Sequence, residues 1–294
     1  MKETKLAFVN EKFVPEEQAA VSIFDRGFLY GDGLFATIRV CNGRPFRWRR
    51  HMLRIHRGAN FLRINIPVPD AKLREYATEL IRLNNMPDSI LRLTISRGIG
   101  RRGYSPKMAA TPTITMSLRP FAETNGPPIW RLRTSSFTLR SSDPLAYFKS
   151  CNRLVQVLAR AEADEAGFDE ALLLNDGGYA VETASGNLFW IDEESVCTAP
   201  LGAGILPGVT RSVIFEVCEA LGRRVQEGAV TREQLLQAQG AFASMSSLGV
   251  VEISAIDETV MPRAEFVAAI REAYEDVVRW ETITEIDKTQ SSKH

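Results

Sequence analysis

The sequence predicts an α+β fold of two lobes, for three reasons. Strand-like alternation and helical spacing are interspersed along the chain, without the regular βαβ rhythm of a doubly wound parallel sheet. The chain has 294 residues, and a single hydrophobic core usually stops growing at about 250–300 residues. Residues 121–129 have the Pro and Gly content of a linker. We therefore expect an N-terminal lobe over 1–120 and a C-terminal lobe over 130–294.

The N-terminal lobe is expected to combine short strands with two amphipathic helices. Asn42-Gly43 lies between two apolar runs and is a typical hairpin turn. Residues 70–84 carry apolar side chains at helical spacing, which predicts one buried face. The expected elements are strands or hairpins over 6–14, 35–46, 90–97 and 111–118, helices over 49–63 and 70–84, and a glycine-containing turn over 25–33.

The C-terminal lobe shows the same mixture of patterns. Asp176-Gly177-Gly178 separates two apolar runs and predicts the turn between two strands. The expected elements are strands over 169–175 and 179–191 and helices over 151–166, 209–222, 231–239 and 264–279.

The composition excludes several classes of partner. Lys+Arg and Asp+Glu are equal at 36 each, so no net field attracts nucleic acid or an anionic membrane. The basic residues of 44–57 alternate with apolar ones, which favours an amphipathic helix over a nucleic-acid-binding patch. The first residues lack the apolar core of a signal peptide, and no stretch is long enough to span a bilayer. We expect a cytoplasmic protein without nucleic-acid or membrane partners.

The cysteines and histidines argue against metal chemistry. The four cysteines are scattered and form no CxxC pair, so reduced and buried thiols are expected. Only three histidines are present, which leaves no convincing His-ligated metal or Ser-His-Asp triad. No metal ligand is therefore predicted.

Lys149 is the first candidate for chemistry. It lies alone between Lys107 and Lys288, beside Tyr147 and Phe148 and before a predicted helix. Partial desolvation there would lower the pKa of its amine and make it nucleophilic towards an aldehyde. The alternative is a lysine whose stem packs on the two aromatic rings while its ammonium stays in water.

Glu182 is a second candidate, because it lies near the middle of an otherwise apolar predicted strand. A carboxylate in such a position needs a buried cation, or it stays protonated. A protonated pyridine nitrogen would suit it, since that pairing keeps a cofactor ring electron-withdrawing. An outward-pointing, solvated Glu182 is the alternative.

The segment 204–211 predicts a tight turn followed by a helix that begins at Val209-Thr210. Free N–H groups, the helix dipole and the Thr210 hydroxyl suit a phosphate monoester. The nucleotide-binding pattern GxxxxGK[ST] is absent, so a single small phosphate fits better. Ser246 and Ser247, in a later hydroxyl-rich turn, could bind the same phosphate. Taken alone, each segment is also explained by an ordinary capped helix or turn.

Together and in this order, these segments resemble the class IV aminotransferases, the fold-type IV pyridoxal-phosphate family. That family includes branched-chain aminotransferases, D-amino-acid aminotransferases and aminodeoxychorismate lyases. The resemblance covers nearly the whole chain, from 21–40 to 244–253. Its most specific motifs are HMLRI, FKSCNRL, DEALLLN, VETASGNLFW and GILPGVTR.

The resemblance implies a cofactor, a set of roles and an assembly. Pyridoxal phosphate would be held by Lys149 through a Schiff base, and Lys149 would move the substrate proton. Glu182 would pair with the pyridine nitrogen. It also implies two α+β lobes with the cofactor between them, in a homodimer whose partner lends residues to each site. The phosphate would be bound by Arg54, Val209, Thr210, Ser246 and Ser247.

The resemblance leaves the reaction partly open. Branched-chain enzymes usually carry a tyrosine after the motif lysine's Asn, where this chain has Arg153. Typical D-amino-acid enzymes carry a tyrosine in place of Phe35 and an Arg-x-His pair at 102–104. Residues 96–105 and 149–154 are similar to those of the lyases. We rank an aminotransferase acting on small amino acids, with D-amino acids favoured, before a lyase and a branched-chain L-amino-acid aminotransferase. A catalytically inactive binding protein of this fold comes last.

The substrate carboxylate needs a cation, and Arg26 and Arg92 are the candidates, with Arg26 reaching across a dimer interface. Ordinary salt bridges are the alternative for each arginine. Arg102 could receive a distal carboxylate. Tyr30 and Phe35 are also expected at the substrate. The small-molecule partners are then an amino acid and a 2-oxo acid.

Overall fold

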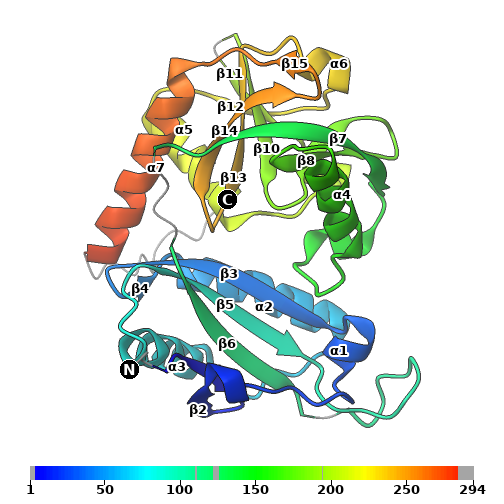
Figure 1. Ribbon diagram of the computed structural model, residues 1–294, viewed down its shortest axis with the longest axis vertical. Coiled ribbons are helices and arrows are strands. Elements are labelled where there is room, and N and C mark those ends of the chain that lie inside the picture. Colours follow the sequence, from blue (N-terminus) through cyan, green and yellow to red (C-terminus); the bar gives the residue numbers. More distant parts are fainter. Residues whose placement is uncertain (1–3, 110, 122–125, 194, 284–294) are drawn as a thin grey trace.

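The computed structural model describes residues 4–109, 111–121, 126–193 and 195–283. Figure 1 shows two β-sheets, one above the other, with helices packed around each of them. The predicted α+β fold is confirmed. The two sheets fall on either side of the predicted linker, of which residues 122–125 lie outside the described residues. The exact lobe boundaries stay a prediction.

The first sheet is antiparallel, with the strand order β2-β1-β6-β5-β3-β4. Strand β5 pairs in continuous register with β3 on one side, from Gly33↔Ser96 to Val40↔Ser89, and with β6 on the other, from Ser89↔Pro120 to Ser96↔Thr113. Its strands are β1 (Leu6–Val9), β2 (Lys12–Pro15), β3 (Gly33–Cys41), β4 (Arg44–Pro45), β5 (Ser89–Ser96) and β6 (Thr113–Pro120). Its helices are α1 (Arg26–Tyr30), α2 (Trp48–Leu62) and α3 (Asp70–Leu83), with a 3₁₀ turn at Glu16–Gln18.

The two faces of the first sheet have different neighbours. Ile38 of β3 and Leu93 of β5 lie in one apolar core with the buried faces of α2 and α3. Side chains alternate along a strand, so the intervening residues of β3 point the other way. Phe35 and Thr37 therefore lie on the face that lines the main pocket. The alternation that predicted this strand also decides which of its residues meet the site.

The second sheet has nine strands in the order β12-β11-β10-β13-β14-β7-β8-β9, with β15 beside β14. It closes on itself because Asn187 of β10 also pairs with Glu182 of β9. Its first strands are β7 (Ile129–Leu139), β8 (Glu170–Asn175), β9 (Ala180–Thr183), β10 (Asn187–Asp192) and β11 (Ser195–Thr198). The remaining strands are β12 (Val225–Glu227), β13 (Gly240–Met245), β14 (Gly249–Ile256) and β15 (Thr259–Val260).

The helices of the second sheet are α4 (Leu154–Glu165), α5 (Val209–Ala220), α6 (Arg232–Leu235) and α7 (Glu265–Ile283). Helices α5 and α7 share one apolar core with β10 and β13, in which Phe189 and Phe242 stack with ring centroids 4.8 Å apart. Helix α4 connects the parallel strands β7 and β8 and packs on them through Ala159 and Ala163. Two 3₁₀ turns, Pro144–Tyr147 and Leu201–Ala203, precede α4 and α5.

The tip of the β3–β4 hairpin belongs to the core of the other sheet. Cys41 and Phe46 are buried among residues of α5 and α7, and the Phe46 ring meets that of Tyr274 edge-on with centroids 6.2 Å apart. Figure 1 shows the lower end of α7 reaching down towards this hairpin. The first sheet is thus anchored to the second close to the start of the linker, since Phe121 N–H donates to the carbonyl of Asp88, whose side chain accepts from the N–H of Asn42 in the hairpin turn.

Arg47 adds a polar clamp directly after that hairpin. Its guanidinium binds Glu281 of α7 at 2.7 Å and Glu216 of α5 at 2.6 Å. Its backbone is in the left-handed region, with φ 53°, at the position before α2. One side chain therefore ties the start of α2 to two helices of the second sheet.

Four of the expected elements differ from the structure. The turn over 25–33 contains the short helix α1, which Asp25 caps by accepting from the backbone N–H of Gly27. The predicted strand 179–191 is two strands, because the chain turns between β9 and β10. The predicted helix 231–239 is the single turn α6, and that over 151–166 begins only at Leu154. A single apolar pattern does not reveal a tight turn inside it.

The helices of the described residues include none that is both long and apolar enough to cross a membrane. All four cysteines are free thiols, and Cys41, Cys197 and Cys218 are buried.

Candidate active site

The main pocket is a cavity of about 710 Å³ between the two sheets. Phe35 and Thr37 of β3 and Arg54 of α2 line it from the first sheet, and the other lining residues come from the second part of the chain. The lining residues from the second part of the chain include Lys149, Arg153, Glu182, Asn187, Thr210, Ser244 and Ser246. The cavity therefore collects residues that lie far apart in the sequence.

Lys149 is fixed by backbone pairing with the beginning of β3. The carbonyl of Lys149 accepts from the N–H of Phe35 at 2.8 Å, and the N–H of Cys151 donates to the carbonyl of Gly33 at 2.9 Å. The Lys149 amine lies 4.8 Å from the centre of the Phe35 ring. Burial, together with the positive charges of Arg54 and Arg153, lowers the pKa of Lys149 to about 7. A large fraction of this amine is therefore neutral and nucleophilic near neutral pH.

Glu182 lies on β9 and is almost fully buried. The backbone N–H of Leu206 donates to its Oε2 at 3.2 Å. Burial raises the pKa of Glu182 to about 7, although Arg153, the Leu206 N–H and Lys149 act in the opposite direction. Its carboxyl group is thus only partly compensated by its protein neighbours, and an added cation would favour the ionised form.

The N-terminus of α5 opens into the pocket. Gly208 is its N-cap residue and provides no side-chain cap, so the first N–H groups of the helix are free to bind an anion. Thr210 Oγ1 lies 3.4 Å from Ser246 Oγ, which brings two hydroxyls from different segments together. Val209 and Ser247 complete this side of the cavity.

Arg54 faces α5 from the first sheet. It donates to the carbonyl of Pro207 at 3.3 Å. Burial and the charge of Arg153 lower the pKa of Arg54 to about 10, so its guanidinium remains charged at neutral pH. A helix N-terminus, two hydroxyls and a buried arginine form a donor set suited to a phosphate.

The structure brings two of the five predicted substrate residues close to Lys149. Phe35 lines the pocket, and the guanidinium carbon of Arg92 lies 3.6 Å from the centre of the Phe35 ring. The charge of Arg92 also acts on Lys149, lowering its pKa after larger contributions from burial and other cations. The Arg92 guanidinium and the Lys149 amine therefore both lie against the same aromatic ring.

Arg92 is exposed and does not line the pocket, and neither do the other three predicted substrate residues within one chain. Arg26 is buried and donates to Asp32 at 3.0 Å and to the carbonyl oxygens of Gly103 and Tyr104. Tyr30 accepts from the N–H of Gly103 at 2.9 Å through its hydroxyl. Within the chain, both side chains hold the loop that follows β5, and Arg102 is exposed on that loop.

Among the pocket residues that sequence reasoning missed are Arg153 and Asn187. Arg153 donates to the carbonyl of Phe148 at 2.6 Å and contributes charge to both Lys149 and Glu182. Asn187 donates to the carbonyl of Leu206 at 2.9 Å. The sequence shows only a polar residue before an apolar run, and it is the strand register that places Asn187 opposite Glu182.

The model of the family described as "Amino-transferase class IV" matches residues 33–256, which is more than half of the chain. The chain belongs to the class IV aminotransferases. The predicted family is therefore confirmed, and so are the predicted enzyme class and cofactor, because class IV aminotransferases use pyridoxal phosphate.

Relatives of this class IV aminotransferase carry three different names. A Methanocaldococcus jannaschii protein, provisionally named as a branched-chain-amino-acid aminotransferase, is 34% identical over 278 residues, 93% of this chain and 96% of its own. The D-alanine aminotransferase of Bacillus licheniformis is 29% identical, covering 84% and 87%. The aminodeoxychorismate lyase of Vibrio harveyi is 33% identical, covering 81% and 88%.

A solved structure gives the same fold. The branched-chain aminotransferase of the thermophilic archaeon Thermoproteus uzoniensis, solved with norvaline, superposes with a TM-score of 0.89 at 27% identity, covering 95% of this chain and 96% of its own.

The pocket of the present enzyme fits pyridoxal phosphate. The buried hydroxyl of Ser244 lines it without a hydrogen-bond partner among the described residues, and a buried hydroxyl of this kind needs a partner.

Proposed function

We propose that this enzyme transfers the amino group of a small amino acid, with D-amino acids favoured, to a 2-oxo acid. The observation that carries the proposal is the amine of Lys149, whose pKa of about 7 suits it both to bond an aldehyde and to move a proton near neutral pH. Bound pyridoxal phosphate supplies an aldehyde and an electron-withdrawing ring that acidifies the α-C–H of an attached amino acid.

Lys149 has two tasks in this proposal. Its neutral amine would bond the cofactor aldehyde and so hold the cofactor in the pocket. When the substrate amine takes its place, the freed Lys149 amine would be the group that accepts the proton from the substrate α-carbon. The stacking of Lys149 beside Phe35 limits the directions in which the amine can move.

Glu182 and the phosphate site hold the two ends of the cofactor. The Glu182 carboxylate would pair with the pyridine nitrogen, and a positive charge there would lower the pKa of Glu182 from its value of about 7. Arg54, Val209 and Thr210 would bind the phosphate, with Ser246 and Ser247 from the facing turn. These groups come from different elements and would fix the ring at both ends.

Arg92 is the proposed ligand of the substrate carboxylate. Its guanidinium stacks on Phe35, on which the Lys149 amine also lies. A carboxylate bound by Arg92 would therefore keep the substrate α-carbon close to Lys149. Arg26, by contrast, is already engaged by Asp32 within its own chain, so we assign it the support of the 97–112 loop.

The preference for D-amino acids is supported by relatives named D-alanine aminotransferase, which are 28–30% identical. The second candidate is a branched-chain L-amino-acid aminotransferase. The observation that favours it is the 34% identical archaeal relative with that provisional name. Both candidates use the same cofactor and differ in the enantiomer that presents its α-C–H to Lys149.

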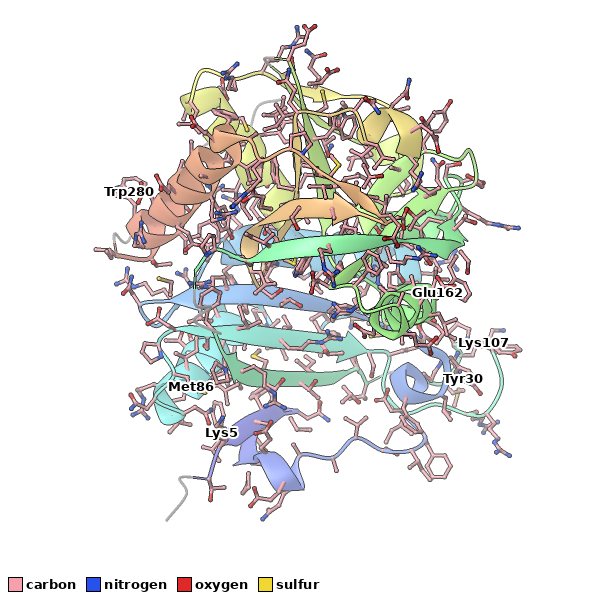
Figure 2. All side chains as sticks on the ribbon, turned by 45° about the horizontal axis from the view of Figure 1, so that its top comes forward. Lys5, Tyr30, Met86, Lys107, Glu162 and Trp280 are labelled. Atoms are coloured by element: carbon pink, nitrogen blue, oxygen red, sulfur yellow. The ribbon has the colours of Figure 1, made fainter. Side chains whose placement is uncertain are left out.

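We also propose that the enzyme is a homodimer. A cluster of large apolar side chains around α1 is exposed to solvent in the single chain: Ile23 is 66% exposed, Phe24 56% and Phe28 73%. Exposed apolar clusters of this kind mark protein–protein interfaces. Figure 2 shows Tyr30, of α1, and Lys107, of the loop after β5, at the same end of the molecule, so that loop would lie next to such an interface.

One experiment separates these functions. The absorbance of the bound cofactor is followed while D-alanine, D-glutamate, L-leucine and L-glutamate are added to separate samples. Loss of the band with D-amino acids only supports the proposal, and loss with L-leucine, with or without L-glutamate, supports the second candidate. A stable band with all four contradicts both and directs the next assay to pyruvate release. If no band forms after pyridoxal phosphate is added, the role of Lys149 is wrong.

A further inference from the structure

We propose that Asn187 is a positioning residue that couples Glu182 to the N-terminus of α5, and that residue 208 is glycine to admit the Asn187 side chain. The inference rests on the proposed roles of Glu182 and α5. It adds a residue that contacts neither the reacting atoms nor the phosphate, but decides how the groups at both ends of the cofactor are placed.

Three polar residues lie in one row across neighbouring strands. Glu182 on β9 is directly opposite Asn187 on β10, and Asn187 is directly opposite Ser244 on β13. Directly opposed residues of antiparallel strands share a face, and all three line the pocket. Asn187 is therefore placed between the buried carboxyl group and the buried, unpartnered hydroxyl of Ser244.

The chain that leads into α5 is held by that row. Asn187 Nδ2 donates to the carbonyl of Leu206 at 2.9 Å, and the N–H of Leu206 donates to Glu182 at 3.2 Å. The next carbonyl, of Pro207, accepts from Arg54 at 3.3 Å. Residues 206–208 thus connect the carboxyl group, the phosphate-facing arginine and the helix N-terminus, and Asn187 is the side chain that holds them against the sheet.

Gly208 shows how closely this segment is packed. Its φ of −69° is available to any residue, so the backbone conformation does not require glycine. A Cβ on residue 208 would instead lie 2.1 Å from Asn187 Oδ1 and 3.2 Å from the Cβ of Arg211. The residue is also an N-cap without a side chain, where Ser or Asp would otherwise occupy the free N–H groups. Glycine therefore serves the Asn187 contact and leaves the anion site open.

A double-mutant cycle tests the contact, with the affinity for pyridoxal phosphate as the readout. We expect Gly208→Ala to weaken binding about tenfold or more, because the alanine displaces Asn187 and the first turn of α5. In an Asn187→Ala background the same change should cost less than about threefold, since the clashing oxygen is gone. Equal losses in both backgrounds, or no loss from Gly208→Ala, would overturn the proposal.

Gly202→Ala is the matched control for this cycle. Gly202 lies in the turn that precedes Gly208, and a Cβ there would meet no atom within 4 Å. Its affinity for pyridoxal phosphate should equal that of the unchanged protein. A loss as large as that of Gly208→Ala would show that any alanine in this segment is harmful, and would contradict the specific contact.

Asn187→Leu tests the donor separately, because it keeps the branched shape of the side chain, adds no charge beside Glu182 and loses the N–H that the carbonyl of Leu206 accepts. We expect weaker binding of pyridoxal phosphate, by about five- to tenfold. The acid-side midpoint in the pH titration of the cofactor absorbance should move to higher pH, because Glu182 loses part of its N–H donation. A merely structural asparagine would leave that midpoint unchanged, and this outcome would overturn the link to Glu182.

Glu182→Gln distinguishes this inference from the proposed function. If Glu182→Gln leaves the cofactor absorbance and its pH titration unchanged, the role of Glu182 itself fails. If Glu182→Gln alters them and the Asn187 variants do not, only the positioning role of Asn187 is wrong.

Discussion

At the cofactor end of the pocket the functional side chains are fixed by backbone hydrogen bonds, whereas at the substrate end the arginines interact with neighbours of their own sheet. Glu182 accepts from Leu206 N–H, and Lys149 is held through the pairing of its carbonyl with Phe35. The Arg92 guanidinium packs on the Phe35 ring and donates a weak hydrogen bond to the Thr94 hydroxyl at 3.4 Å. Arg26 is paired with Asp32.

The difference explains why the cofactor is better defined than the substrate. Residues from both sheets converge on the cofactor end within one chain, and Glu182 and Arg54 each have a hydrogen-bond partner that fixes their direction. The substrate end has one cation near Lys149 and a loop that points away towards exposed apolar residues of α1. Specificity therefore depends on fewer contacts, and on a surface where a partner chain would complete the site.

The largest expected effect is at the cofactor end. Lys149→Ala should lower kcat by about 10³-fold or more, because both the covalent attachment and the proton transfer are lost. The measurement is steady-state kinetics at saturating pyridoxal phosphate. Lys12→Ala, exposed on the edge strand β2 of the first sheet, is the matched control and should retain full activity. A Lys149→Ala enzyme with more than a tenth of the activity would contradict the assignment.

The same lysine predicts a pH dependence. The pKa of Lys149 is about 7, below its ordinary value, so the amine gains nucleophilicity as pH rises through 7. The rate at which the cofactor-free protein bonds pyridoxal phosphate should therefore increase between about pH 6 and 8 and then level off. Stopped-flow absorbance measures that rate. A rate that keeps rising to about pH 10 would indicate an ordinary, solvated lysine.

An intermediate effect is expected at the substrate end. Arg92→Ala should raise the KM for the amino acid about 10- to 100-fold with kcat changed less than about threefold, because a charge-assisted hydrogen bond to the carboxylate is lost. Arg119→Ala, on the neighbouring strand β6, is the control, since Arg119 is exposed and pairs with Glu16. An unchanged KM for Arg92→Ala would leave the carboxylate without its proposed ligand.

The smallest catalytic effect is expected from Arg26→Ala. Its guanidinium holds Asp32 and two loop carbonyls, so the free energy of unfolding should fall by about 2–4 kcal/mol while KM changes less than about threefold. Thermal unfolding and kinetics on the same sample measure the two quantities. A KM increase as large as that of Arg92→Ala, with stability retained, would show that Arg26 binds the substrate carboxylate after all.

Local patterns predicted most elements of the fold. The alternation along β5 and the helical spacing of α3 are each decided by a single buried face, which a sequence shows directly. The break between β9 and β10 was missed because Thr183 and Ser185–Gly186 interrupt a run that remains apolar on either side. A turn of this kind is fixed by hydrogen bonds of Thr183 with Gly186, which leave no periodic signal.

The site was predictable only where chemistry is unusual. Lys149 and Glu182 stand out because a charged group among apolar neighbours is costly to bury without a partner of opposite charge. Asn187 was missed because its importance comes from strand register, which places it between Glu182 and Ser244. Arg26 is an ordinary arginine in sequence, and its partner Asp32 lies just beyond the end of α1, where only the folded turn brings the two together.

The burial of Phe46 against α7 determines which contacts can form last when the protein folds during synthesis. Its burial partners Tyr274 and Val278 lie near the other end of the chain, in the last described helix. During synthesis from the N-terminus, the first sheet can form its own core long before those residues leave the ribosome. Phe46 and Cys41 must remain uncovered throughout that interval. The hairpin therefore gains its full set of contacts with the second sheet only after α7 has been made.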